Sequence, residues 1–168
     1  MNSKIITLSG LFFALFSTML CALPEDKQHP VHLQAERIAV NQRTHQTTFA
    51  DNVRIDQGST HLRAAQASAL IDEHHQLQLA VAEGNHKTQA HAWTTLTLNK
   101  PDVHAWADVI RYYPRTERLI LIGHARLMQE PNTFLAPKIT YDMKNHHVIT
   151  SNQGTDRTHI VIERPSHL

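Results

Sequence analysis

Histidine is the residue type with the most potential chemistry in this sequence, because its 168 residues include fourteen histidines. An imidazole ring can bind a metal ion or transfer a proton near neutral pH. The spacing does not favour a metal site, since no His-x-His, His-Glu-x-x-His or Cys-His cluster occurs. Neighbours such as His74-His75 and His146-His147 would point to opposite faces of a strand. We expect solvated strand and turn residues and no metal ligands, with a His-rich metal-binding protein as the alternative.

Two pairs of carboxylates, Asp72-Glu73 and Glu25-Asp26, are the candidates for acid–base catalysis. Both pairs alternate off the apolar stripe, at a turn and near the chain start, so a solvated role is expected. No serine stands in a Gly-x-Ser-x-Gly setting, and neither a phosphate loop nor a dinucleotide fingerprint occurs. We therefore predict no catalytic residue, no cofactor and no enzyme. An exported hydrolase that uses Asp, Glu or His is the competing hypothesis.

The charge balance bears on the kind of partner. Lysine plus arginine number 16 and aspartate plus glutamate 15, which gives a formal net charge of +1. Because a phosphate backbone rewards a larger basic excess, nucleic acid is not expected as a partner. Arg54 and Arg126 recur at equivalent positions of an internal repeat. They either keep an outward strand face soluble or contact an anionic head group, and the sequence leaves both open.

The N-terminus has the layout of a signal peptide, in which Lys4 precedes an apolar run from Ile5 to Leu20. Cleavage after Ala22 would remove residues 1–22 and leave residues 23–30 as a flexible N-terminal segment of an exported protein. The run is shorter than the ~20 residues that span a bilayer, and an uncleaved membrane anchor is the alternative. The single cysteine, Cys21, would be removed, so the mature chain would have no disulfide.

An internal repeat, in which one constant offset lays Ala35 on Ala107, is the strongest organisational feature of the chain. It needs no gap, and apolar positions agree along with identical ones. The identical pairs are Ala35 with Ala107, Ile38 with Ile110, Arg43-Thr44 with Arg115-Thr116, Arg54 with Arg126, Gln57 with Gln129, Ala64 with Ala136, and His74-His75 with His146-His147. The repeat predicts one architectural unit that occurs twice.

Short segments of alternating apolar and polar residues, separated by turn residues, predict an all-β fold. An example is Val53-Arg54-Ile55-Asp56 before Gln57-Gly58-Ser59. Turn clusters recur at short, fairly even intervals, a spacing typical of a sandwich or jellyroll. Residues 62–82 are rich in Ala, Gln and Leu and have helical propensity. Their repeat counterpart, residues 137–141, favours a strand; strands are therefore expected, with a partly helical segment as the alternative.

Five stretches between Pro30 and Ile162 occur in the order found in one protein family. They are Pro30-Val31-His32-Leu33-Gln34-Ala35-Glu36, Thr48-Phe49-Ala50-Asp51-Asn52-Val53, Gln57-Gly58, Leu121-Ile122-Gly123-His124-Ala125 and Lys138-Ile139-Thr140-Tyr141. In series they resemble the OstA-like family of periplasmic lipopolysaccharide-transport proteins. Two residues depart from the family pattern: Asp51 replaces a glycine before Asn-Val, and His124 replaces the second such asparagine. The C-terminal tail, residues 163–168, is short for the family.

The resemblance implies an open, twisted β-jellyroll of many short antiparallel strands, two repeated units and an apolar interior groove over residues 31–162. It further implies a periplasmic protein that binds lipopolysaccharide and carries it from the inner to the outer membrane. An LptC-like inner-membrane component would contact the N-terminal edge, residues 30–36, and an LptD-like outer-membrane component the C-terminal edge, residues 141–162. Head-to-tail self-association is expected as well. A membrane-anchored LptC-like sibling of the same pathway is the alternative.

Alternation proposes which side chains line the interior. A face shared by apolar residues contains Val31, Leu33, Ile38, Val40, Phe49, Val53, Ile55 and Leu62 in the first unit, and Ile110, Tyr112, Leu121, Leu127, Phe134, Ile139, Tyr141 and Met143 in the second. The same pattern would also form an ordinary closed core, and the sequence does not separate a trough from a core.

Overall fold

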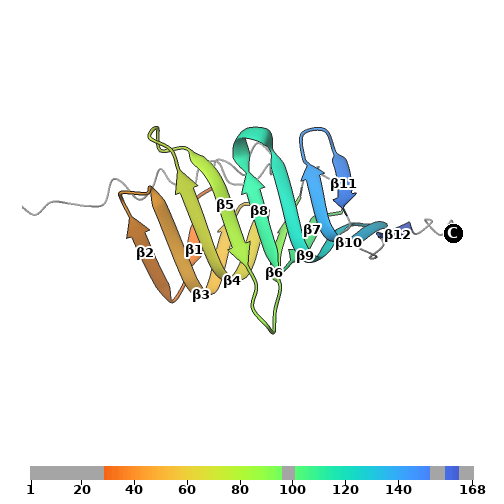
Figure 1. Cartoon of the computed structure of the whole chain (residues 1–168), viewed down its shortest axis with the longest axis horizontal. Helices are drawn as coiled ribbons and strands as arrows, with labels where there is room; N and C mark the ends of the chain where they lie inside the picture. Colours follow the sequence, from red (N-terminus) through yellow and green to blue (C-terminus); the bar gives the residue numbers. More distant parts are fainter. Residues whose placement is uncertain (1–28, 96–100, 152–157, 163–168) are drawn as a thin grey trace, which may run out of the picture.

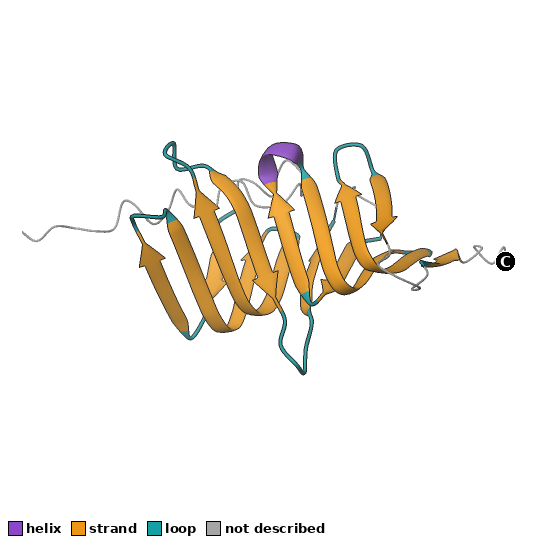
Figure 2. Ribbon diagram, in the orientation of Figure 1, coloured by secondary structure: helices purple, strands orange, loops and turns teal. Residues whose placement is uncertain are grey.

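All strands of the computed structural model belong to one antiparallel, twelve-stranded sheet (Figures 1 and 2). The structure describes residues 29–95, 101–151 and 158–162. The predicted signal peptide, most of the segment 23–30 and the tail 163–168 lie outside these residues. Within the described ranges, no helix is long and apolar enough to cross a membrane.

The strands follow the predicted turn spacing. They are β1 His32–Gln34, β2 Arg37–Asn41, β3 Gln46–Gln57, β4 Thr60–Ile71, β5 Leu77–Glu83, β6 Ala90–Thr94, β7 Val103–Ala107, β8 Val109–Tyr113, β9 Arg118–Gln129, β10 Asn132–Asp142, β11 His147–Ser151 and β12 His159–Ile162, with a 3-10 turn at Pro114–Thr116. The partly helical alternative for residues 62–82 is therefore wrong, because this stretch forms β4, a turn and β5.

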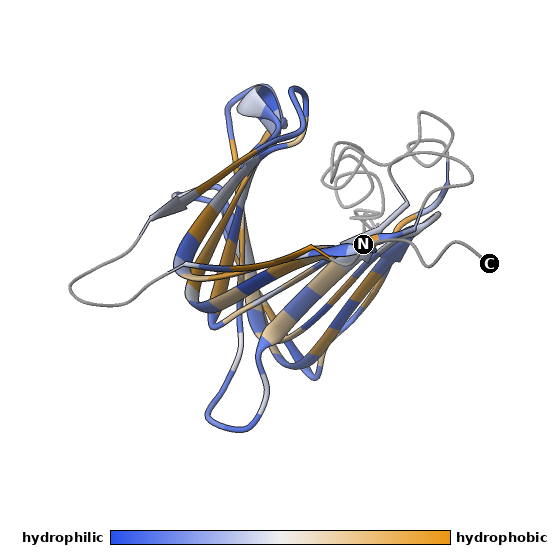
Figure 3. Cartoon of the chain, turned by 90° about the vertical axis from the view of Figure 1, so that its right-hand side faces the viewer, coloured by the Kyte–Doolittle hydropathy of each residue, from blue (hydrophilic) through white to orange (hydrophobic). Residues whose placement is uncertain are grey.

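Four long strands, β3, β4, β9 and β10, run through both layers of the fold. One half of each pairs within a first layer that also contains β2, β5, β8 and β11. The other half pairs within a second layer that also contains β1, β6, β7 and β12. Figure 3 looks along this stack of strands and shows two arms that diverge from a common bend. The result is the open β-jellyroll arrangement that the resemblance implied.

The bend of β3 and β9 occurs at consecutive residues in the left-handed backbone conformation. In β3 these are Asp51 and Asn52, with φ of 63° and 53°; in β9 they are Gly123 and His124, with φ of 77° and 45°. The two pairs occupy equivalent positions of the sequence repeat, so the repeat coincides with the corner. Aspartate, asparagine and histidine tolerate this conformation better than most residues. The departures at Asp51 and His124 therefore leave the corner intact.

Each corner is held by the residue that joins two short strands. The Asp108 amide donates to the Gly123 carbonyl at 3.0 Å, and the Glu36 amide donates to the Asp51 carbonyl at 3.1 Å. The side chains repeat the pairing, because Asp108 contacts His124 and Glu36 contacts Asn52. Glu36 and Asp108 are also equivalent in the repeat, which extends it to a hydrogen-bonded unit.

The repeat shifts by one residue at the β4–β5 and β10–β11 turns. His75 and His146 occupy the left-handed positions there, with φ of 60° and 50°. The sequence alignment paired His75 with His147 instead. The shift arises because β10 has 11 residues whereas β4 has 12.

We predict that replacing Gly123 by alanine destabilises the protein. A β-carbon there would collide with the Asp108 carboxyl group, and the positive φ adds strain for any residue with a side chain. We expect the free energy of unfolding to fall by about 1–2 kcal/mol, measured by urea denaturation. The exposed Gln78→Ala in β5 is the control, expected to unfold as the parent does. An unchanged midpoint in Gly123→Ala would show that the corner is unconstrained.

Candidate functional site

The interior between the two layers is the candidate site, and most residues predicted for it are buried there. Buried members are Phe49, Val53, Ile55, Leu62, Ile110, Tyr112, Leu121, Leu127, Ile139, Tyr141 and Met143. Val31, Leu33 and Phe134 are partly buried against the same cluster. The alternation of apolar and polar residues thus indicates which face of each long strand points inward, because a strand that runs through both layers keeps the same face toward the interior.

Ile38 and Val40 differ from the other predicted residues because they are exposed, at 47% and 52%. Ile38 pairs with the buried Phe49, and Val40 pairs with the buried Thr47. Directly opposite residues of antiparallel strands share a face, so both side chains point inward. They are exposed because β2 is the outermost strand of its layer. The interior thus presents bare apolar side chains at its N-terminal end.

The C-terminal end is uncovered in the same way. Ile160 and Ile162 of β12 pair with Phe134 and Asn132 of β10. Ile160 therefore shares the inward face with Phe134 and is 53% exposed, and Ile162, two residues on, is 71% exposed. Among the described residues, every exposed large hydrophobic side chain except Leu135 lies on β2, β11 or β12. Of these side chains, Ile38 and Val40 at one end and Ile160 and Ile162 at the other face the interior and leave it uncovered at both ends of the strand stack.

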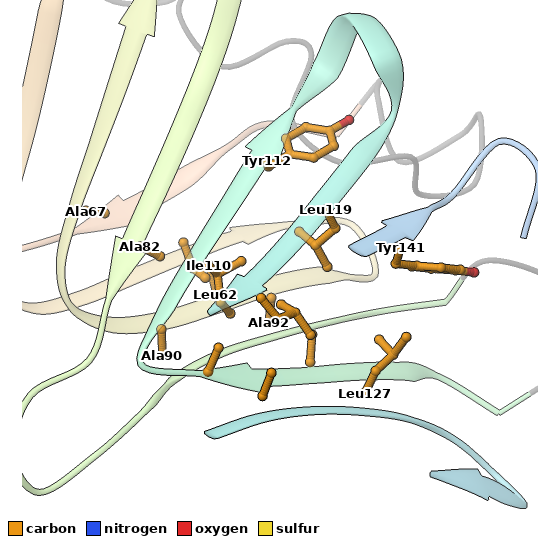
Figure 4. Packing of buried hydrophobic residues seen from close by; sticks show 14 of the residues in the cluster. Leu62, Ala67, Ala82, Ala90, Ala92, Ile110, Tyr112, Leu119, Leu127 and Tyr141 are labelled. Carbon is orange, nitrogen blue, oxygen red and sulfur yellow. The ribbon is translucent and has the colours of Figure 1, made fainter. Parts of the chain in front are cut away.

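Alanine residues provide much of the inward face, so the walls of the interior are smoother than the predicted lining residues alone would make them. Buried alanines are Ala67, Ala69, Ala82, Ala90, Ala92, Ala105, Ala107, Ala125 and Ala136. Figure 4 shows Ala90 and Ala92 of the second layer near Leu62 and Ile110. The predicted set of lining residues names none of these alanines individually. Their regular alternation in Ala90-His91-Ala92 and Ala105-Trp106-Ala107 was the available clue.

The two layers pack closely in the middle of the stack. A cavity of about 30 Å³ remains between Phe49, Leu62, Ala82, Ile110 and Leu119, among other residues. A second cavity of about 10 Å³ is lined by residues that include Ala92, Val103 and Tyr141. Burial raises the pKa of the Tyr141 phenol, which therefore stays neutral. Among the described residues, no buried side-chain polar atom lacks a hydrogen-bond partner.

A cluster of rings on the outer face of the second layer was missed by the sequence interpretation. His91 and Trp93 of β6 lie opposite Trp106 and His104 of β7. His91 stacks on Trp106 with ring centres 4.5 Å apart, and it lies equally close to Trp93. The tripeptide His-Ala-Trp occurs at residues 91–93 and again at 104–106, which was the available clue. Arg126 lies on this outer face, over Trp106, and Arg54 lies on it as well, opposite Arg63 of β4.

His91 is unlike an ordinary solvated histidine. Burial, together with nearby His104, Arg126 and Arg63, lowers the pKa of His91 to about 4. Its Nε2 atom is 3.2 Å from Nδ1 of His104, a hydrogen-bond distance that requires one ring to donate and the other to accept. In the described part of the chain, no three histidine, cysteine or acidic side chains converge as metal ligands.

The sequence matches a family model over residues 32–147, described as the LptA and LptD N-terminal-domain lipopolysaccharide-transport protein. The matched span contains both corners and most of the strands that enclose the interior. The chain belongs to this LptA family. Its predicted membership is thereby confirmed, and the open β-jellyroll is the expected architecture for such a member.

Individual relatives agree with the family assignment. The chain is 29% identical over 146 residues to the lipopolysaccharide export system protein LptH of Pseudomonas aeruginosa, covering 87% of this chain and 81% of that protein. It is 25% identical over 166 residues to LptA of Haemophilus influenzae, covering 96% and 91%. The crystal structure of the Pseudomonas LptH, described as a periplasmic component, superposes with a TM-score of 0.73 at 26% identity, covering 84% of this chain and 100% of that one.

The family assignment indicates the process in which this chain takes part. Its members are lipopolysaccharide-transport components, and this chain is accordingly a periplasmic component of that system. The interior, with its two uncovered ends, remains the candidate site of this LptA-family chain.

We predict that His91 makes stability depend on pH. Its pKa in the folded protein, about 4, lies below its ordinary value of 6.5. Protonation therefore favours the unfolded chain, so stability is complete above about pH 6.5 and declines as the pH falls toward 4. His91→Phe should flatten this decline in urea unfolding at pH 7, 5.5 and 4.5. His86→Gln, at an exposed position, is the control; an equal decline in parent and His91→Phe would contradict the assignment.

Proposed function

We propose that this protein carries lipopolysaccharide across the periplasm with the acyl chains held between its two layers. The observation that carries the proposal is an apolar interior whose inward-facing side chains are uncovered at both ends. Exposing a single twelve-carbon acyl chain to water costs on the order of 9 kcal/mol, so a lipid with several chains cannot cross an aqueous space unshielded. An apolar surface that continues through the protein removes this cost.

The alanine walls support acyl chains as the cargo. Alanine side chains leave a shallow, even surface, and a flexible hydrocarbon chain needs no polar contacts. The cavity of about 30 Å³ is far smaller than an acyl chain, so loading requires the two layers to move apart. The layers are joined along the bend and diverge on the other side, which permits such an opening (Figure 3). The lipid would replace packing contacts of Leu62 and Ile110, which line this cavity.

The exposed edges support end-to-end assembly. Within the described residues, β1 and β2 each pair only with β3, and β11 and β12 each pair only with β10. Unpaired strand edges either aggregate or recruit a partner strand. Joining the C-terminal edge of one copy to the N-terminal edge of the next would make a heterologous contact that extends the interior. By the same geometry, an LptC-like component would meet the N-terminal edge and an LptD-like component the C-terminal edge.

Cleavage of residues 1–22 belongs to the proposal, because a membrane-anchored LptC-like sibling would keep this segment. Mass spectrometry of the periplasmic protein tests it. A mature chain that begins at Leu23 supports the carrier, and a protein that begins at Met1 and stays with the inner membrane would assign it to the anchored sibling.

We predict that Ile38→Asp weakens lipopolysaccharide binding. Ile38 faces the interior yet is exposed, so the substitution leaves the buried core intact. Because an unpaired carboxylate that faces acyl chains loses its hydration, we expect a loss of affinity of about tenfold or more, equivalent to about 1.4 kcal/mol or more. Binding of fluorescent lipopolysaccharide to the purified mature chain is the measurement. Ala39→Asp, the next residue on β2 and on its opposite face, is the matched control; equal affinity for both variants would place the cargo elsewhere.

We predict that deleting residues 158–168 reduces self-association. The deletion removes β12, one of the two strands at the C-terminal edge, and leaves the interior between Phe49 and Ile139 in place. Light scattering over a dilution series should show concentration-dependent oligomers for the parent and fewer for the deletion variant. Lipopolysaccharide binding should be largely retained and serves as the control for folding. A parent chain that stays monomeric at every concentration would refute stacking through this edge.

A further inference from the structure

A strip of rings and guanidinium groups crosses the outer face of the second layer, on the side away from the interior. Cross-strand register places Arg54, Arg63, His91, Trp106 and Arg126 in one row, from β3 to β9. His61, Trp93 and His104 form the adjacent row. We call these eight residues the tryptophan–arginine strip. It contains both tryptophans of the chain.

The aromatic rings of the strip stack on one another in a continuous row. His61 stacks on Trp93 at 4.8 Å between ring centres, Trp93 on His91 at 4.5 Å, and His91 on Trp106 at 4.5 Å. An arginine guanidinium group also lies over each tryptophan ring. Arg63 is 5.2 Å from the Trp93 ring centre, and Arg126 is 3.7 Å from the Trp106 ring centre. All four rings of β6 and β7 remain partly exposed. Because these rings stack on one another and under the guanidinium groups, they present their edges to solvent, and the edges of indole and imidazole rings contain N–H groups.

The arginines at the two ends of the strip are available to an anion. Arg63 is occupied, because its guanidinium contacts the Asp56 carboxylate at 2.8 Å and the Leu62 carbonyl at 2.9 Å. Arg54 and Arg126 are exposed and pair with no carboxylate of the described residues. Four inter-strand steps separate them, or about 19 Å. A ligand that reaches both must be extended and carry more than one negative group.

Phosphate-bearing sugar chains have the chemistry that this surface complements. Sugar hydroxyls accept hydrogen bonds from the N–H groups at the edges of indole and imidazole rings. Phosphate groups are bound by arginine through paired, charge-assisted hydrogen bonds. A hydrocarbon chain would make no use of the guanidinium groups, and a simple anion would make no use of the rings. Both kinds of group are needed only by a ligand that combines sugar rings with negative charge.

The strip also lies close to the open side of the fold. Trp93 and His104 are each one residue from the strand ends Thr94 and Val103, at the ends of β6 and β7 away from the bend. A sugar chain that leaves the interior through the open side therefore passes this margin before it reaches Trp106 and Arg126. The acyl chains and the saccharide of one molecule can thus occupy opposite faces of the second layer.

We propose that the tryptophan–arginine strip binds the phosphorylated saccharide of a lipopolysaccharide whose acyl chains lie in the interior, an inference that rests on the proposed function. The rings hold the sugar backbone, and Arg126 and Arg54 hold phosphate groups at the two ends. The saccharide is thereby kept against the carrier and does not trail in solution.

Titration of the mature protein with deacylated, phosphorylated core oligosaccharide tests the strip, because this probe has no acyl chains for the interior. Intrinsic fluorescence is a local readout, since Trp93 and Trp106 are the only tryptophans. We expect a saturable change and a loss of affinity of about tenfold or more in Arg126→Gln. Arg111→Gln, an exposed arginine on the outer face of the first layer, is the matched control and should bind as the parent does.

The outcomes separate this inference from the proposed function. Ile38→Asp should bind the deacylated probe normally, and Arg126→Gln should still bind intact lipopolysaccharide through its acyl chains. Absence of saturable binding, equal affinity of Arg126→Gln and the parent, or undiminished binding of a dephosphorylated probe would each overturn the inference. Tighter binding of a carboxylated cell-wall glycan fragment, or of an acidic peptide, would assign the strip to that partner and overturn it as well.

Discussion

The corner in β3 and β9 is the constraint on which the rest of the structure depends, because a long strand can serve two layers only if it bends. Left-handed residues at Asp51-Asn52 and Gly123-His124 produce the bend, and the amides of Glu36 and Asp108 fix it through hydrogen bonds. Without it the long strands would continue in a single layer, which would enclose no interior. With it, one continuous hydrogen-bonded sheet encloses an apolar space on a single side, while its two ends stay uncovered. An open-ended interior is thus a consequence of bending one sheet.

Sequence alone predicted the parts of the fold that repeat or alternate. The repeat reflects the corner, because the residues that form the bend and those that hydrogen-bond to it recur in the second unit at the same offset. Period-two alternation identified Phe49, Leu121 and Ile139 as inward-facing, and all three are among the most deeply buried side chains. These predictions succeeded because backbone geometry dictates both patterns, whichever residues pack opposite.

The exposure of individual side chains, and the contacts between side chains of different strands, were harder to predict. Ile38 obeys the same alternation as Ile110, its equivalent in the second unit, yet it is exposed at 47% whereas Ile110 is buried at 3%. The difference lies in what stands beside each strand, since β8 has neighbours on both sides and β2 has one. The ring cluster escaped prediction for a related reason. His91 and Trp106 lie on different strands, and only the register of β6 against β7 brings them together.

The two faces of the second layer carry different kinds of side chain, which suits the proposed amphiphilic cargo. Alternation gives β6 and β7 an inner face of alanine and an outer face of histidine and tryptophan, so the same two short strands meet both surfaces. The small inner side chains allow the two layers to pack closely in the middle of the stack. Large outer rings then stabilise a ribbon whose alanine face contributes little packing, because cross-strand aromatic pairs are worth up to about 1 kcal/mol each. This structural contribution is compatible with the proposed binding role, since rings held in place by their own stacking present their edges and Arg126 to a ligand without further ordering.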